Sequence, residues 1–353
     1  MSIFNAEMRR RLWNTTLEIV IQSSIDSGGP AMISSADFDT EPPGNFDDVQ
    51  LMADSLGTSD PEQRPPDLYT QTSLSIALRD TFPARLSIAK HLNDLRPARP
   101  SYQDLLRLDA EMREAYRRLC KSLQGLRNGG VTRFDSKFLD FIVRRYFLSL
   151  HIPWFGSALR DASFAYSRRV VVDTASRLWQ TVSGDDDLST LAICGAGFLR
   201  SIPMQACLVI ATELRAQLIE EDSLGPKTPR PDLLAILHEA RDWTLKRIEA
   251  GETNIKGYLS FCAGIAHIEA LTQSLSDDEV HQAFVSITEE SLHRCLAILQ
   301  GRSQSRNGSD RMAEADGGWD MTDVQFGASE AESFFTLSPS WLLDDTSPSL
   351  STW

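Results

Sequence analysis

Histidine is the side chain that proteins use most often to bind transition metals and to move protons near neutral pH. The 353-residue chain has six histidines, but they form no metal-ligand spacing with one another or with the five cysteines. His238-Glu239 also lacks the second histidine that a zinc protease helix requires. We therefore predict no metal site and expect core or surface positions for these histidines. They are His91, His151, His238, His267, His281 and His293.

Clustered aspartates are the second group that could do chemistry, because carboxylates hold magnesium and calcium. Asp185–Asp187 would suit an all-helical enzyme such as a terpene synthase, but no aspartate stands where the next helical turn would place it. We expect a solvated loop and a helix N-cap there. Asp37, Asp39, Asp47 and Asp48 lack the regular ligand spacing and central glycine of an EF-hand, so we expect solvated loop acids.

Glycine-rich motifs give no stronger signal. Gly195-Ala196-Gly197 is a fragment of a dinucleotide-binding fingerprint, but it lies in an apolar helical run without a preceding strand. We interpret it as a place where helices pack closely. The sequence has neither a phosphate-binding loop ending in Gly-Lys-Ser/Thr nor a Gly-x-Ser-x-Gly elbow. It therefore predicts no catalytic and no cofactor-binding residues.

The elements that position these residues are expected to be helices. Apolar residues recur at steps of three and four along most of the chain, without strand-like alternation, so we predict an all-α fold. One apolar stripe runs from Leu105 to Leu126, with Ser101 as N-cap and Gly129-Gly130 as the end of its helix. The other predicted helices cover residues 5–27, 68–95 with an interruption at Pro83, 136–151, 162–182, 188–221 with a break near Pro203, 232–250, 254–274 and 277–299.

The chain divides into a helical part and a tail. With 42% apolar residues, residues 1–300 are long enough to form a single large helical domain. Within it, residues 41–66 are rich in Pro, Asp and Gly, which is typical of a loop. Residues 301–353 combine a polar linker with acids, serines and isolated large apolar residues. We expect this segment to be a disordered acidic tail.

Composition also limits the partners. The net charge of −14 disfavours DNA binding by this chain alone, because it repels phosphate backbones. The five cysteines are far apart and mostly lie in apolar runs, which is typical of reduced, buried thiols in an intracellular protein. The N-terminus has no apolar core of signal-peptide length, and the longest uncharged stretch, residues 188–199, is too short to span a bilayer.

The N-terminal stretch carries the most specific motif. EMRRRLW at residues 7–13 is followed at residues 23–51 by SSIDSGGPAMISSADFDTEPPGNFDDVQL. An Arg-Arg-x-Trp helix, a turn with Gly and Pro, an Ile-x-x-x-Asp-x-Asp loop and a closing Pro and Asp-Asp follow one another in this order. The pattern resembles the fungal transcription factor regulatory domain, also called the middle homology region, of binuclear zinc cluster regulators.

A second patch resembles a downstream segment of the same family. Residues 141–175, FIVRRYFLSLHIPWFGSALRDASFAYSRRVVVDTA, match its Leu-His-x-Pro corner and its Tyr-Ser-Arg sequence. The residues matched to the family motifs are Arg9, Arg10, Arg11, Trp13, Gly29, Pro30, Ile33, Asp37, Asp39, Pro43, Asp47, Asp48, His151, Pro153, Tyr166, Ser167 and Arg168.

The first patch also suits a structural role. Trp13 and the apolar residues after it give the helix an apolar face. The basic run at residues 9–11 is interpreted as a solvated or ion-paired helix face rather than a nuclear import signal. Gly28 and Gly29 can adopt the left-handed conformation that ends a helix, and Pro30 prevents the helix from resuming.

The resemblance implies a regulator of transcription by RNA polymerase II that acts in the nucleus and is not an enzyme. Members of the family begin with a six-cysteine cluster that holds two zinc ions and reads DNA, whereas this sequence has no Cys-x-x-Cys. We therefore expect no cofactor in this chain and DNA contact only through a missing domain or a partner. The chain is expected to be the C-terminal part of a regulator, from a shortened gene product or an incomplete gene model.

The expected partners are proteins. We expect a homo- or heterodimer and no membrane contact, and we predict that the acidic tail contacts transcription machinery or a coactivator. The sequence leaves open an inert tail, a helical ligand-binding or scaffold protein acting through protein contacts, and an all-α enzyme. The candidate activation contacts are Phe334, Phe335, Trp341, Leu342 and Leu343.

Overall fold

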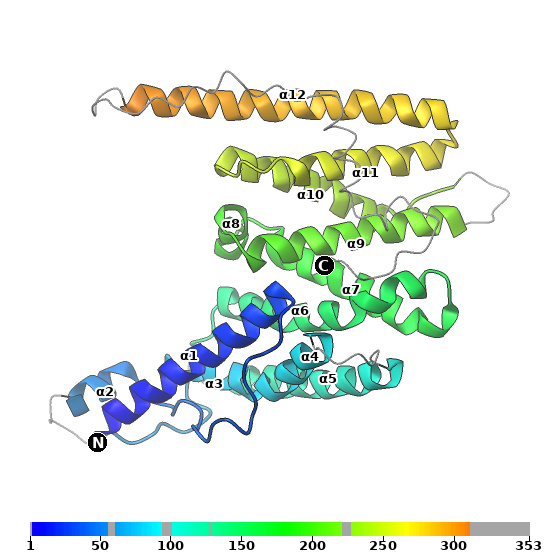
Figure 1. Ribbon diagram of the computed structural model, residues 1–353. Coiled ribbons are helices and arrows are strands. Elements are labelled where there is room, and N and C mark those ends of the chain that lie inside the picture. Colours follow the sequence, from blue (N-terminus) through cyan, green and yellow to red (C-terminus); the bar gives the residue numbers. More distant parts are fainter. Residues whose placement is uncertain (1, 56–60, 94–100, 128, 221–226, 311–353) are drawn as a thin grey trace. The chain divides into compact units, whose positions relative to one another are not determined.

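The computed structural model describes residues 2–55, 61–93, 101–127, 129–220 and 227–310 (Figure 1). These residues form twelve α-helices and one short 3-10 helix, and no strand occurs among them. The predicted all-α fold is confirmed. The predicted tail contacts, from Phe334 to Leu343, lie outside the described residues.

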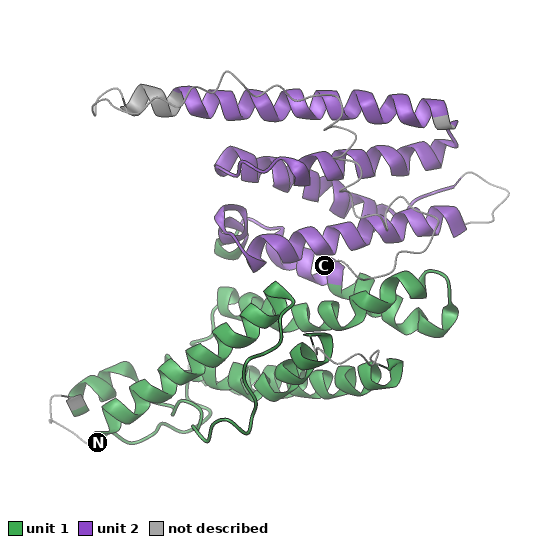
Figure 2. Ribbon diagram, viewed as in Figure 1, with its two compact units in different colours: residues 1–174, 186–188 green, residues 175–185, 189–353 purple. Residues whose placement is uncertain are grey.

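The helices divide into two compact units. Unit 1 contains residues 1–174 and 186–188, and unit 2 contains residues 175–185 and 189–353 (Figure 2). The helix that covers residues 165–182 therefore begins in unit 1 and ends in unit 2. The prediction of one helical domain over residues 1–300 did not include this division.

Unit 1 begins with a long helix and ends within another. Ser101 accepts the backbone N–H of Asp104 at 3.1 Å and caps its helix as predicted, whereas Thr132 and Asp135 form a reciprocal capping box. The stripe helix ends at Gln124, earlier than the predicted Gly129-Gly130. The elements are α1 (Ile3–Ser27), α2 (Asp48–Ser55), α3 (Ser73–Asp80), α4 (Phe82–Asn93), α5 (Tyr102–Gln124), α6 (Arg133–Ala158), η1 (Ala162–Phe164) and the first part of α7 (Ala165–Val182).

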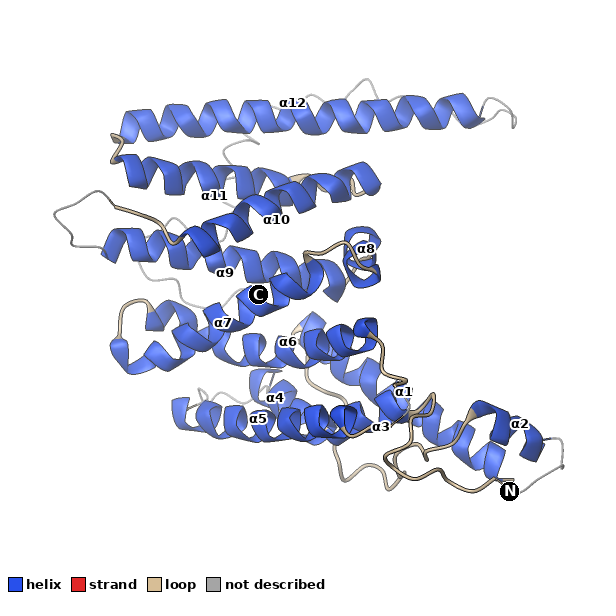
Figure 3. Cartoon of the chain, turned by 180° about the vertical axis from the view of Figure 1, so that it is seen from behind, coloured by secondary structure: helices blue, strands red, loops and turns tan. Residues whose placement is uncertain are grey.

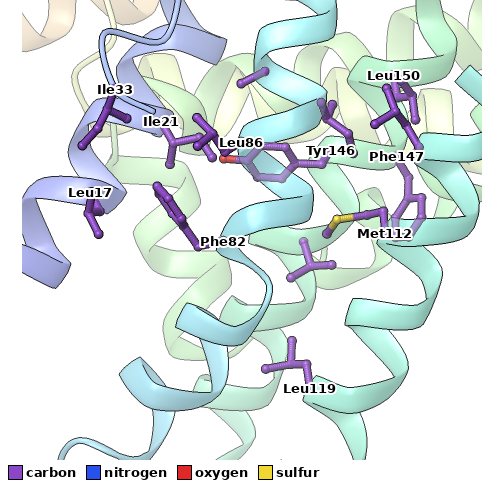
Figure 4. Close-up of a cluster of buried hydrophobic side chains, with 14 of the residues drawn as sticks. Leu17, Ile21, Ile33, Phe82, Leu86, Met112, Leu119, Tyr146, Phe147 and Leu150 are labelled. Carbon is purple, nitrogen blue, oxygen red and sulfur yellow. The ribbon is translucent and has the colours of Figure 1, made fainter. Parts of the chain in front are cut away.

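The core of unit 1 is built from side chains of helices α1, α3, α4, α5 and α6 (Figure 4). Leu17 and Ile21 of α1 are fully buried, one helical turn apart, because they lie on the same face of the helix. The stripe predicted for α5 points into this core, where Met112 is 0% exposed. The labelled core residues are Leu17, Ile21, Ile33, Phe82, Leu86, Met112, Leu119, Tyr146, Phe147 and Leu150.

Unit 2 is a stack of helices that follow one another along the chain (Figures 1 and 3). A cluster of buried side chains that includes Ile248, Tyr258, Cys262 and Cys295 joins the last three helices. The elements after α7 are α8 (Asp187–Cys194), α9 (Phe198–Glu220), α10 (Pro231–Ala250), α11 (Lys256–Gln273) and α12 (Asp277–Asp310). Helix α12 reaches Asp310, so the boundary expected at Gly301 falls inside a helix.

The Gly-Ala-Gly fragment is a turn, and the interpretation as helix packing was wrong. Residues 195–197 separate α8 from α9, and Gly197 has a positive φ of 59° that a residue with a side chain adopts less readily. The buried guanidinium of Arg247 donates to the carbonyls of Ile193 at 2.9 Å and Gly195 at 2.8 Å, and also to that of Ala192. It thereby satisfies carbonyls that the end of α8 leaves without intrahelical partners.

Two prolines lie inside helices where the sequence predicted breaks. Helix α6 continues past Pro153 to Ala158, so the predicted corner is not a corner, and α9 continues past Pro203. Phe155 and Ala158, beyond Pro153, are buried at 5% and 4% exposure. Packing of this last turn outweighs the hydrogen bond that proline removes. The interruption predicted at Pro83 is present, since α3 ends at Asp80 and α4 begins at Phe82.

Helix α9 is long and apolar enough, by length and composition, to cross a membrane. Of its most apolar stretch, 61% is buried inside the structure. Ile210 and Leu214 are both 0% exposed. Burial among neighbouring helices therefore accounts for its apolar character.

Candidate functional site

A buried carboxylate joins the N-terminal helix to the acidic loop in unit 1. Glu7 of α1 is 0% exposed, and both of its carboxylate oxygens accept the backbone N–H of Gly44 at 3.0 Å. Arg11 donates to Glu7 at 3.3 Å and to the carboxylate of Asp48 at 2.6 Å. Arg11 also donates to the carbonyl of Phe46 at 3.3 Å. These five residues, which we call the Glu7 clasp, hold the start of α1 to the start of α2.

The three arginines of the basic run at residues 9–11 differ in their surroundings. Arg9 is exposed, whereas Arg10 lies 3.6 Å from the carboxylate of Glu7 and Arg11 belongs to the clasp. Asp47 accepts from Arg64 at 3.0 Å. Two of the three arginines form ion pairs on the helix face, and Asp47 and Asp48 are paired rather than merely solvated, which corrects the expectation for these two acids.

The loop predicted at residues 41–66 is interrupted by helix α2 (Asp48–Ser55), which corrects that prediction in part. The chain on both sides of α2 is fixed by an asparagine that the sequence did not single out. The side-chain amide of Asn45 donates to the carbonyls of Pro65 at 2.8 Å and Leu68 at 3.0 Å, and its oxygen accepts from Thr70 at 2.7 Å. Asn45 is 8% exposed. Because one side chain bonds several backbone groups outside the helices, it takes the place of regular secondary-structure hydrogen bonds there.

The remaining residues of the first patch have separate positions. Trp13 packs edge-on against Phe38, with ring centroids 5.6 Å apart, and Ile33 lies in the core. Gly28, with φ of 68°, ends α1 in the left-handed conformation, and the carbonyl of Gly29 accepts from Ser24 at 2.7 Å. Pro30 and Asp39 are exposed, and Pro43 is buried. Asp37 accepts the backbone N–H of Ser34 at 2.6 Å in a local turn.

Residues of the second patch converge on one buried carboxylate of α5. His151 of α6 places Nε2 3.2 Å from Asp109 Oδ1 and Nδ1 2.9 Å from Ser167 Oγ of α7. The hydroxyl of Tyr166 donates to Asp109 Oδ2 at 2.6 Å, and Arg113 donates to the same oxygen at 2.7 Å. Tyr102 closes the set, since its hydroxyl lies 3.0 Å from Ser167 Oγ. We call Tyr102, Asp109, Arg113, His151, Tyr166 and Ser167 the Asp109 network.

Three donors decide the charge of Asp109. Burial alone would raise the pKa of this carboxyl, but hydrogen bonds from His151, Arg113 and Tyr166 and the charge of Arg113 outweigh it and lower the pKa to about 2. The carboxylate is thus ionised and accepts from every neighbour. The same contact raises the pKa of Tyr166, because burial and the adjacent carboxylate both disfavour phenolate.

The Ser167–His151–Asp109 arrangement has the residue types of a hydrolytic triad, but its geometry favours a structural role. Ser167 and His151 are both 0% exposed, and Asp109 is 3% exposed. The serine oxygen is also shared with Tyr102, so it is held between two partners. A nucleophile has to reach its substrate, and this hydroxyl is covered.

An open hollow of about 490 Å³ lies beside the Asp109 network in unit 1. Tyr102, Asp109, Arg113 and Tyr166 line it together with Leu106, Ala110, Arg117 and Ser163. Most of these residues belong to one face of α5, and Ser163 and Tyr166 come from η1 and the start of α7. The hollow therefore has an apolar wall, cationic side chains and hydroxyl groups in one place.

Sequence reasoning singled out only part of this site. It named His151, Tyr166 and Ser167 from the family motif, but it did not name Asp109 or Arg113. One signal was available, because Asp109 interrupts the apolar face of α5 one turn after Leu105. Of the other two motif residues, Pro153 is exposed and Arg168 is half-buried, and neither belongs to the network.

The predicted absence of a metal site can be compared only with the described part of the chain. Within it, no group of three His, Cys, Asp or Glu side chains could hold a metal ion. Asp187 begins α8, and Asp186 accepts from Lys137 at 2.6 Å, consistent with a loop and helix start.

The five cysteines are free and differ in exposure, since Cys194 is exposed and Cys120 is half-buried. Cys207, Cys262 and Cys295 are buried inside helices. Burial raises the pKa of the Cys207 thiol, and burial together with Cys262 raises that of Cys295 to about 11.

Comparison with known proteins relates the chain to fungal transcription factors. It is 32% identical over 329 residues, 86% of its length, to transcription factor lepE of Aspergillus flavus. It is 30% identical over 332 residues, 85% of its length, to transcription factor opdR of Penicillium oxalicum. It is also 30% identical over 326 residues, 87% of its length, to the aspyridones cluster regulator apdR of Emericella nidulans. The resemblance to fungal transcription regulators is therefore confirmed.

The matches cover only part of each relative. The chain spans about two fifths of the length of these relatives, namely 38% of lepE, 41% of opdR and 44% of apdR. No model of a protein family matches the chain. No solved structure matches it either.

Proposed function

We propose that the chain is the helical regulatory region of a fungal transcription regulator that controls transcription by RNA polymerase II in the nucleus. The observation that carries this proposal is the similarity to three fungal regulators over 85% to 87% of the chain. A match of this extent covers most of the chain rather than one short motif. Of the residues that first pointed to the family, Arg11 and Asp48 belong to the Glu7 clasp. His151, Tyr166 and Ser167 belong to the Asp109 network.

The region acts through protein contacts and not as an enzyme. Ser167 and His151, the residues best suited to catalysis, are fully covered and serve to hold α5, α6 and α7 together. DNA is reached through another domain or a partner, because the net charge of −14 opposes direct binding to phosphates. Under this proposal the partners include a second regulator chain, in a homo- or heterodimer. The proposal includes no membrane contact and no cofactor for this chain.

The segment after residue 310 supplies the contact with the transcription machinery. Its acids surround isolated aromatic and aliphatic residues in the sequence. A short segment of this kind can fold as a helix whose apolar side enters a coactivator groove. The residues proposed for this contact are Phe334, Phe335, Trp341, Leu342 and Leu343.

A tethering experiment tests the proposal. The full chain is fused to a heterologous DNA-binding domain and expressed in yeast with a reporter of moderate basal activity, so that a rise or a fall can be measured. We expect reporter transcription several-fold above that of the DNA-binding domain alone. Equal expression of the two proteins in the nucleus with equal reporter output would contradict the proposed function.

A further inference from the structure

We propose that the hollow beside the Asp109 network binds a small organic anion with a flat apolar body, such as an aromatic carboxylate. Its volume of about 490 Å³ is in the range that accommodates a small molecule. The ligand would regulate the chain, and to that extent the inference rests on the proposed function. The binding itself can be tested on the purified chain without any transcription assay.

The wall of the hollow provides the apolar contact. Leu106 and Ala110 of α5 lie one turn apart, and Tyr102 lies one turn before Leu106, so the three side chains share a face of the helix. Leu106 is 38% exposed and Tyr166 is 42% exposed, although both are large. A flat ring laid against them would remove this surface from water, which is favourable by about 25 cal/mol for each Å².

Two arginines of α5 provide the positive charge. Arg113 and Arg117 are four residues apart and both line the hollow. Arg113 uses its Nε to pair with Asp109, which leaves the terminal nitrogens of a rigid five-donor fork for a second acceptor. Arg117 has an exposed ion pair with Glu114 at 3.1 Å, and because such exposed pairs contribute little, the carboxylate of a ligand can replace Glu114 at little cost.

The one carboxylate in the hollow does not repel such a ligand strongly. Asp109 already accepts from Arg113, Tyr166 and His151, so its charge is compensated within the network. Ser163 adds a hydroxyl from η1. Three donors of the protein thus already use Asp109 as acceptor, whereas Arg113 and Arg117 both line the hollow with positive charge, which favours an anion over a cation.

The position of the hollow suggests what binding would change. Its lining joins α5 to the start of α7. Helix α7 begins in unit 1 and continues into unit 2. A ligand that contacts both Arg117 and Tyr166 would stiffen the first turn of this shared helix, and regulation would follow from that ordering.

The test uses the purified full chain with 1-naphthoate as the probe and 1-naphthamide as its uncharged isostere. Titration calorimetry should give a dissociation constant of about 0.1 mM for the naphthoate, a value typical of a ligand of this size, and at least tenfold weaker binding of the amide. Arg117→Gln should weaken naphthoate binding about fivefold, as expected for loss of one partly exposed charge contact. Arg118→Gln alters the next residue along the chain, which does not line the hollow, and should leave naphthoate binding unchanged.

A second variant separates loss of binding from loss of folding. Ala110 is exposed, so Ala110→Trp should fold normally, fill the hollow and abolish binding while the circular dichroism spectrum and melting temperature are kept. The inference is overturned if the wild-type chain gives no binding heat at millimolar naphthoate, if the amide binds equally well, or if the Arg117 and Arg118 variants bind alike. None of these results would affect the tethering experiment, so the two proposals fail separately.

Discussion

The imidazole of His151 and the carboxylate of Asp109 come from different helices, 42 residues apart in the sequence, with Nε2 and Oδ1 3.2 Å apart. The carboxylate cannot donate, so Nε2–H donates to it. In the neutral imidazole Nδ1 then accepts from the hydroxyl of Ser167, which in turn accepts from Tyr102. A chain of hydrogen bonds therefore links α5, α6 and α7 inside unit 1, and its loss should be measurable as stability.

Replacing Asp109 by asparagine should destabilise unit 1. Asparagine keeps the shape but removes the charge that three donors share, and hydrogen bonds to a charged group contribute about 1.5–3 kcal/mol each. We expect a loss of about 2–3 kcal/mol in the free energy of unfolding, measured by urea denaturation. Glu111→Gln, on the same helix but exposed, should change stability by less than about 0.5 kcal/mol. Equal stability of both variants would show that the charge of Asp109 does not stabilise unit 1.

Acid should abolish the contribution of the Asp109 charge. The folded pKa of about 2 lies below the ordinary 3.8, so the carboxylate stabilises the fold fully above about pH 4, and this effect is lost as the pH falls toward 2. Between these pH values the wild-type chain should lose about 1–2 kcal/mol more than Asp109→Asn, after allowance for solvent screening. Denaturation of both proteins at several pH values measures this. Parallel stability curves would show that Asp109 is not held ionised by its neighbours.

Replacing Glu7 by alanine should release the acidic loop. The change leaves the backbone N–H of Gly44 buried without its acceptor and removes a partner of Arg11, which should cost about 2–3 kcal/mol. Limited proteolysis should then cut within residues 41–66 faster than in the wild-type chain. Arg9→Ala is the matched control on the same helix, because Arg9 is exposed. Unchanged cleavage rates in the Glu7 variant would mean that the clasp does not hold the loop.

Replacing Arg247 by lysine should weaken unit 2 although the charge is kept. The planar guanidinium donates to three carbonyls at the end of α8, and an ammonium group cannot reproduce that geometry. We expect a loss of about 2–3 kcal/mol, seen as faster hydrogen exchange in α8 and α10. Lys246→Arg, at the exposed neighbouring position, serves as the control. Wild-type exchange in the Arg247 variant would show that the cap is not needed.

The helices could be predicted from local pattern, because period and caps are local properties. The stripe from Leu105 to Leu119 and the Ser101 cap both depend on residues within a few turns. Pro153 was misread for the same reason: its local preference opposes a helix, but burial of Phe155 and Ala158 decides the outcome.

The candidate site could be predicted only in part. Tyr166 donates a hydrogen bond to Asp109, which lies 57 residues earlier in the sequence. No periodicity specifies which distant helix will face a given side chain. The family motif supplied His151 and Ser167, but Asp109 and Arg113 lie outside it. Asn45 was missed because an asparagine in a loop has an ordinary local role, and its partners become apparent only in the folded chain.

The most direct measurement is transcription in vitro by RNA polymerase II in a nuclear extract. The template carries the site of a heterologous DNA-binding domain, and the full chain is supplied as a purified fusion to that domain. The proposed function predicts several-fold more transcript than with the DNA-binding domain alone, and loss of most of that gain when Phe334, Phe335, Trp341, Leu342 and Leu343 become alanine, since the apolar contacts with a coactivator are removed. Transcript equal to that from the DNA-binding domain alone, with the fusion folded and bound to its site, would contradict it.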